Sequence, residues 1–205
     1  MRTALSVATV LTIACAGTAY AQAGSLLPTS AELASAELQI RAAVEALPAQ
    51  FRANATVLGY RSGVSGLVQL RAGDGPFVCL ADDPKDARFH VACYHRSLEP
   101  LMARGRELRA AGVTGAAVDS VRGTEAAAGT LKMPAQPAAL YSLTAQTGTP
   151  DAQTGLVAGA RPLHVIYVPF ATAESTGLPT RPSPGQPWLM GAGTFKAHIM
   201  FTPSM

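Results

Sequence analysis

The segment FVCLADDPKDARFHVACYH, residues 77–95, decides how we expect this chain to fold. Two apolar runs, FVCLA and FHVACYH, flank the polar segment DDPKDAR, whose residues are typical of tight turns. Each run holds one cysteine, Cys79 or Cys93. On neighbouring antiparallel strands, residues that face each other at a non-hydrogen-bonded pair have the short Cα separation that a disulfide requires. The segment therefore predicts two antiparallel strands joined by a Cys79–Cys93 disulfide.

Further strands are expected on both sides of this pair. ATVLGY (55–60) and GLVQL (66–70) are short apolar or alternating runs, separated by the turn-rich segments RSGVSG and RAGDGP. Together with residues 77–95 they predict a β-meander. PAALYSL (137–143), PLHVIYVPF (162–170) and KAHIMF (196–201) have the same strand-like character.

Helical patterns occupy the remaining apolar segments. Thr29 and Glu32 have capping-box spacing and predict a helix that ends before Pro48. Ser97 is the expected N-cap of a second helix, over residues 98–112, which Gly112 stops. A weaker helix is expected over residues 114–128. The fold class predicted is α+β: an antiparallel sheet with two or three helices packed on one side, forming a single domain over residues 30–205.

The N-terminus carries a targeting pattern. Arg2 is followed by an apolar run, and Ala19 and Ala21 form the A-x-A pattern of a secretory signal peptide. We expect residues 1–21 to be a signal peptide cleaved after Ala21, and residues 22–29 to be a flexible leader. Lipidation at Cys15 is disfavoured, because Thr12 stands where a leucine is expected. The mature protein is then periplasmic or secreted, a location that suits a disulfide.

Charge and motif content exclude several classes of protein. The net charge is only +3 and no basic run is present, so we expect no nucleic-acid partner. No later run has the roughly 20 apolar residues that cross a bilayer, so no transmembrane segment is expected in the mature chain. Phosphate-loop, nucleophile-elbow, zinc-protease and C-x-x-C motifs do not occur. No cofactor is predicted, and the partner expected is an unidentified small molecule or protein.

Several segments together carry a resemblance. They are FVCLADDP, ACYHRSLEPLMARGRELRAAG, LKMPAQPAALY, VPFATAESTGLP and PWLMGAGTFKAHIM. In combination and order they resemble blocks in a group of uncharacterised exported bacterial proteins, over most of residues 51–203. The resemblance implies a bacterial, exported protein. It transfers no catalytic or binding residue, because that group has no assigned activity.

A soft-metal site is one alternative function. Cys93 and His95 share a strand face, as do His198 and Met200, since residues two apart on a strand point the same way. One cysteine, two histidines and one methionine are the ligands of electron-transfer copper centres. A disulfide would remove the Cys93 thiolate, which leaves His95, His198 and Met200 as the candidates. We therefore predict no metal site, with copper binding as an alternative.

A histidine-dependent hydrolase is the other alternative. His164 or His198 would act as general base beside the segment AEST (173–176), which offers a carboxylate and hydroxyl groups. That segment belongs to the Pro-rich stretch 171–187, which has no hydrophobic period. Arg161 with His164 is a candidate pair for an anionic ligand.

The function that we favour is a ligand- or partner-binding or structural domain rather than an enzyme. Trp188, beside the Pro-rich stretch, is a candidate apolar anchor for a partner. The ligand-binding candidates are thus His95, His164, His198, Arg161 and Trp188. Convergence of His95, His164 and His198 in one pocket, with a carboxylate or with Met200, would favour the enzyme or metal alternative, and their placement on separate faces would disfavour both.

Overall fold

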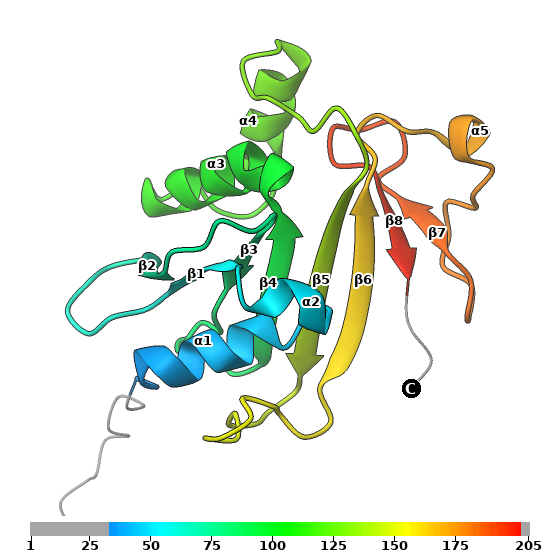
Figure 1. Ribbon diagram of the computed structural model, residues 1–205. Helices are drawn as coiled ribbons and strands as arrows, with labels where there is room; N and C mark the ends of the chain where they lie inside the picture. Colours follow the sequence, from blue (N-terminus) through cyan, green and yellow to red (C-terminus); the bar gives the residue numbers. More distant parts are fainter. Residues whose placement is uncertain (1–32, 202–205) are drawn as a thin grey trace, which may run out of the picture. The chain divides into compact units, whose positions relative to one another are not determined.

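The computed structural model describes residues 33–201. The predicted signal peptide, the leader and the Thr29–Glu32 capping box lie outside the described residues. Within residues 33–201 the chain forms one mixed sheet of eight strands, together with five α-helices (Figure 1). The predicted α+β class is confirmed.

The sheet has the strand order β2-β1-β3-β4-β5-β6-β8-β7. The strands are β1 (Thr56–Gly59), β2 (Val68–Arg71), β3 (Phe77–Leu80), β4 (Phe89–His95), β5 (Ala138–Ala145), β6 (Arg161–Tyr167), β7 (Trp188–Met190) and β8 (His198–Phe201). Every pair of neighbouring strands is antiparallel except β1 and β3, which are parallel.

The first three strands do not form the predicted meander. β2 folds back onto the outer side of β1, and the chain then crosses to the other side of β1 to form β3. The segment RAGDGP makes this crossing by passing close to the start of β1. A Cβ added to Gly73 would lie 2.3 Å from the carbonyl oxygen of Asn54, and one added to Gly75 would lie 2.7 Å from the same atom. These glycines permit a close backbone approach rather than a tight hairpin turn.

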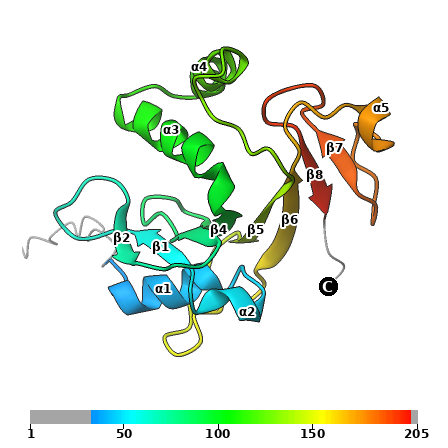
Figure 2. The same ribbon diagram turned by 45° about the horizontal axis from the view of Figure 1, so that its top comes forward.

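Helices cover both faces of the sheet, rather than the one face predicted (Figure 2). α1 (Ala36–Val44) and α2 (Ala49–Arg52) lie on one face, and α3 (Glu99–Ala110) and α4 (Ala116–Ala127) lie on the other. Alternate residues of the same strands feed the two cores. Cys79 and Cys93 pack in the core beneath α1, while Val78 and Tyr94 pack in the core beneath α3. We refer to these as the α1 face and the α3 face.

The helix boundaries follow their caps. α1 begins after Ser35, whose Oγ accepts a hydrogen bond from the backbone N–H of Leu38 at 3.2 Å. Ser97 is not the N-cap predicted for α3: it lies in a short 3₁₀ turn, Arg96–Leu98, and α3 starts at Glu99. α3 ends as predicted, with Gly112 in the left-handed region at φ 83°.

The Pro-rich stretch holds one short helix, α5 (Ala173–Thr176). Thr172 and Ser175 cap it reciprocally, and Gly177 ends it with φ 68°. Across the described part of the chain, no helix has the length and apolar character needed to cross a membrane.

The two cysteines meet as the sequence predicts. Cys79 of β3 and Cys93 of β4 are register partners, with their Cα atoms 3.9 Å apart and their Sγ atoms 2.06 Å apart, a disulfide distance. Both side chains are fully buried in the core on the α1 face.

Candidate functional site

The three candidate histidines do not converge. Strand pairing aligns Cys93, Tyr141 and His164, so His164 lies on the α1 face, as does His95. His198 pairs with Tyr167, and Tyr167 pairs with Ala138 of the core beneath α3. His198 therefore lies on the α3 face.

Each of these histidines contacts a residue close to it in the sequence or on a neighbouring strand. The Nδ1 of His95 accepts a hydrogen bond from the Ser97 backbone N–H at 3.2 Å and lies 2.8 Å from the Ser97 hydroxyl. His164 packs edge-on against Tyr141, with ring centroids 5.2 Å apart. His198 stacks on Tyr167 at 5.1 Å, and its Nδ1 donates to the Lys196 carbonyl oxygen at 2.7 Å.

The copper ligand set is not assembled. Met200 lies two residues from His198 and shares its face, but His95 lies on the opposite face and Cys93 is paired with Cys79. Among residues 33–201, no three His, Cys, Asp or Glu side chains are close enough to hold a metal ion.

The remaining candidates lie apart from one another. Arg161 is exposed at the start of β6, and Trp188 is half-buried on the edge strand β7. In α5, the hydroxyls of Ser175 and Thr176 both donate to the Thr172 carbonyl oxygen, at 3.1 and 2.8 Å. The AEST segment thus uses its hydroxyls to form a helical turn.

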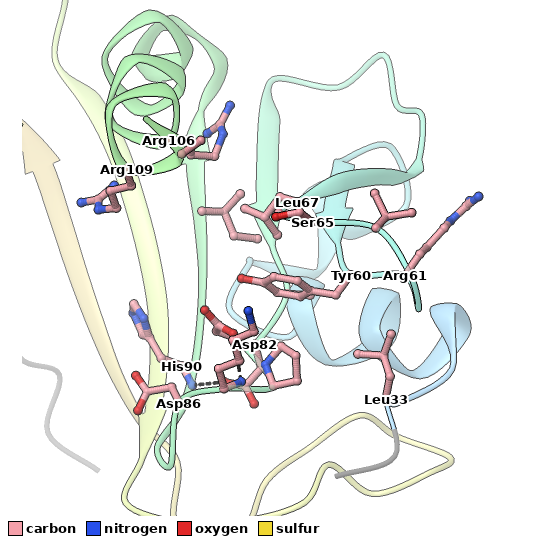
Figure 3. Close-up of a pocket in the computed structure, with 18 of the residues that line it drawn as sticks. Leu33, Tyr60, Arg61, Ser65, Leu67, Asp82, Asp86, His90, Arg106 and Arg109 are labelled. Carbon is pink, nitrogen blue, oxygen red and sulfur yellow. Dashed lines mark hydrogen bonds between the residues drawn. The ribbon is translucent and has the colours of Figure 1, made fainter. Parts of the chain in front are cut away.

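A site that the sequence did not reveal lies on the α3 face. A cleft of about 960 Å³ opens between α3, the β1–β2 connection and the β3–β4 connection. Its lining includes Leu80 and Ala92, which are register partners on β3 and β4. We call it the α3 cleft. Figure 3 shows Arg106 and Arg109 of α3 across the cleft from Asp82, Asp86 and His90.

A buried glutamine fixes the β1 side of the cleft. The Gln39 side chain donates to the carbonyl oxygens of Ala34 (2.7 Å) and Tyr60 (3.0 Å), and accepts from the Tyr60 backbone N–H at 2.8 Å. A Cβ on Gly59 would lie 2.6 Å from the Gln39 Oε1, so glycine makes room for this contact. Gln39 therefore holds the backbone from which the Tyr60 side chain enters the cleft.

A second network fixes Arg106. Its Nη2 donates to Glu99 Oε1 at 2.6 Å, and its Nη1 donates to the hydroxyl of Tyr94 at 2.9 Å. That hydroxyl donates in turn to Glu99 Oε2 at 2.5 Å. Tyr94 is almost fully buried in the core beneath α3, so the network joins Arg106 to a rigid base. Arg109, one helical turn further on, is exposed and has no ion-pair partner among residues 33–201.

The opposite wall contains three aspartates and one lysine, Lys85. Asp82 Oδ1 accepts from the backbone N–H of His90 at 2.7 Å. Asp83 and Asp86 accept from the backbone N–H groups of Lys85 and Arg88, both at 3.0 Å, as aspartates in turns commonly do.

Several titratable groups in the α3 cleft have pKa values shifted from their ordinary values. Burial raises the pKa of Tyr60 to about 12, and the nearby Asp83 carboxylate adds to the effect. Burial also raises the pKa of Asp82, and it lowers the pKa of His90 although that side chain reaches the surface. Several perturbed groups lining one concavity are typical of functional sites.

Only part of the α3 cleft could be predicted from sequence patterns. Strand alternation correctly places His90 on the face opposite Cys93, but it does not show that a cleft lies there. DDPKDAR has the composition of a turn, and two of its three aspartates do serve a turn. No spacing rule links that segment to Arg106 and Arg109, because the fold alone brings them together.

Comparison of the chain with protein-family models, curated protein sequences and solved structures finds no match. The class of protein supported by the structure is therefore an α+β domain with a mixed-charge cleft on one face of its sheet.

Proposed function

We propose that this protein is an exported ligand-binding domain and that the α3 cleft is its binding site. The observation that carries the proposal is the cleft itself. It has apolar side chains such as Leu80 and Leu67 in its lining and charged groups on facing walls. Pockets for small ligands typically have volumes of roughly 300–1,000 Å³, with an apolar lining and a few positioned polar groups. The α3 cleft has that size, and its lining combines apolar side chains with a larger share of charged groups.

The preorganisation of the walls supports binding. Gln39 holds the backbone of Tyr60, and Tyr94 and Glu99 hold the side chain of Arg106. Side chains that are ordered before the ligand arrives lose less conformational entropy on binding.

The binding test maps the site residue by residue. The oxidised, processed protein, labelled with ¹⁵N, is titrated with a library of small polar and amphipathic fragments. We expect amide shifts clustered at Tyr60, Asp82, His90 and Arg109. Ala92→Phe, which fills the floor of the cleft, should abolish them, while Ala127→Phe on the exposed surface of α4 should leave them unchanged. Shifts clustered elsewhere, or no saturable shift at all, would contradict the proposal.

Export is supported by the signal-like N-terminus, by the cysteine pair at disulfide distance and by the resemblance to exported bacterial proteins. Expression of the full chain in a bacterial host, followed by fractionation and N-terminal sequencing, tests it. We expect periplasmic or secreted protein that begins at Gln22 and has no free thiol. Cytoplasmic protein retaining Met1 would contradict it.

A further inference from the structure

We propose that the ligand of the α3 cleft is a small zwitterion, whose anionic group binds at the Arg106–Arg109 wall and whose ammonium group binds at the Asp82 wall. This inference rests on the proposed function and specifies its ligand class.

The anionic end of the ligand is assigned to α3. Arg106 is held in place by Glu99 and Tyr94, and Arg109 has no ion-pair partner among the described residues. A guanidinium group has five N–H donors, and the network to Glu99 and Tyr94 uses only two of those of Arg106. Guanidinium groups bind carboxylates and phosphates with directional hydrogen bonds, so this wall suits an oxyanion.

The cationic end is assigned to Asp82. Its Oδ1 accepts the His90 backbone N–H, while Oδ2 makes no hydrogen bond or ion pair within residues 33–201. The neighbouring Asp86 lies on the same wall, where Arg88, with its Nη2 3.9 Å from Asp86 Oδ2, partly balances its charge. His90 lies beside both aspartates with its pKa lowered by burial, so at neutral pH it adds no positive charge that would repel an ammonium group.

The balance of charge explains why a zwitterion is favoured over a simple ion. The lining contains four basic and four acidic side chains, and the two arginines of α3 lie across from Asp82 and Asp86. Lys85 and Glu107 also line the cleft, but among residues 33–201 neither Asp82 nor Arg109 has an ion-pair partner, so a monoanion at Arg109 would leave Asp82 unpaired and a monocation at Asp82 would leave Arg109 unpaired. A ligand with both charges satisfies both walls, and an apolar segment between them would lie over Leu80 and Ala92.

The test uses matched probes with the full processed protein at about pH 7.5. The zwitterion 6-aminohexanoate is compared with hexanoate, which lacks the ammonium group, and with hexylamine, which lacks the carboxylate. 4-Aminobutyrate and 8-aminooctanoate vary the distance between the charges. Dissociation constants come from ¹⁵N amide titrations. We expect at least one of the three zwitterions to bind about tenfold more tightly than either singly charged probe.

Two variants assign the ends. Arg109→Gln should remove the preference of the zwitterion over hexylamine, and Asp82→Asn should remove its preference over hexanoate. Lys132→Gln and Asp74→Asn are the matched controls, because both residues are exposed and lie outside the cleft lining. These controls should retain both preferences.

The outcomes separate the two proposals. Equal affinity for all probes, or hexanoate binding as tightly as every zwitterion, would overturn the zwitterion assignment while leaving the cleft as a binding site. The same holds if no probe binds but fragments from the library still do. If neither the probes nor the library fragments shift cleft residues, both proposals are wrong.

Discussion

Asp82 shows how a residue placed for binding affects the stability of the fold. Its carboxylate is half-buried and accepts one backbone hydrogen bond, and burial raises its pKa. A group whose pKa is raised on folding binds its proton more tightly in the folded state. Its contribution to stability is therefore present at low pH and is lost as pH rises through the folded-state pKa. At neutral pH, the ionised Asp82 side chain works against folding.

Asp82→Asn should consequently increase the free energy of unfolding at pH 7, by roughly 0.5–1 kcal/mol, because asparagine keeps the Oδ1 acceptor and removes the buried charge. The gain should shrink at acidic pH, as the pH falls through the raised folded-state pKa of Asp82 and the aspartate takes up its proton. Urea denaturation at neutral and at acidic pH measures this, with the exposed Asp74→Asn as control. A loss of stability of equal size at both pH values would contradict the argument.

Gln39 is the second residue whose effect reaches the cleft. Gln39→Leu keeps a similar volume but removes three hydrogen bonds, and it leaves the backbone N–H and carbonyl groups of Tyr60 without their partner. Because the site is buried, we expect a loss of about 2–3 kcal/mol in the free energy of unfolding. Gln69→Leu, on the exposed side of β2, is the matched control and should change stability by less than about 0.5 kcal/mol. If Gln39→Leu lowers the free energy of unfolding by less than about 0.5 kcal/mol, water replaces the hydrogen bonds of the glutamine.

At the scale of elements, locally encoded features could be predicted from the sequence. Leu101, Gly105 and Leu108 of α3 recur at helical spacing and are buried, and Gly112 ends the helix as expected. The facing cysteines follow from two strands joined by a turn, which is also a local signal. In each case, the residues that determine the structure lie within a few positions of it.

Strand order and helix placement could not be predicted, because they depend on contacts between distant segments. Strand alternation predicts that two faces exist, but nothing local shows that α1 covers one and α3 the other. The parallel β1–β3 pair depends on the crossing at Gly73, and in sequence that glycine is indistinguishable from one in a turn. The α3 cleft was missed for the same reason, since its walls come from one helix and two connections that are far apart in the sequence.

The close approach of Gly73 to the start of β1, where the chain crosses from β2 to β3, provides a prediction about these elements. Gly73→Ala would place a methyl group 2.3 Å from the Asn54 carbonyl oxygen and 2.7 Å from the Ala55 carbonyl oxygen, so the backbone must move. We expect a loss of about 3 kcal/mol in the free energy of unfolding, measured by urea denaturation. The adjacent, exposed Asp74→Ala tests for a general effect in the same segment and should be nearly neutral. Equal stability of both variants would show that the crossing is not tightly packed.

In the described domain as a whole, one sheet separates two cores, and the cysteine pair anchors the core on the α1 face. Cys79 lies on β3 and Cys93 on β4, the strands that also contribute Leu80 and Ala92 to the cleft on the other face. Constraining these strands therefore stabilises the fold and the floor of the α3 cleft together.

The Cys79→Ala/Cys93→Ala double variant tests this coupling. The cysteines are separated by 14 positions, and a crosslink that closes a loop of this length stabilises a protein by about 3 kcal/mol in the chain-entropy model. We expect the double variant to lose about that amount in urea denaturation, relative to the oxidised protein. Because both sulfur atoms are fully buried, dithiothreitol should release thiols in urea but not under native conditions. Rapid release of thiols from the native protein would show that β3 and β4 separate without global unfolding, and the cleft floor would then be mobile as well.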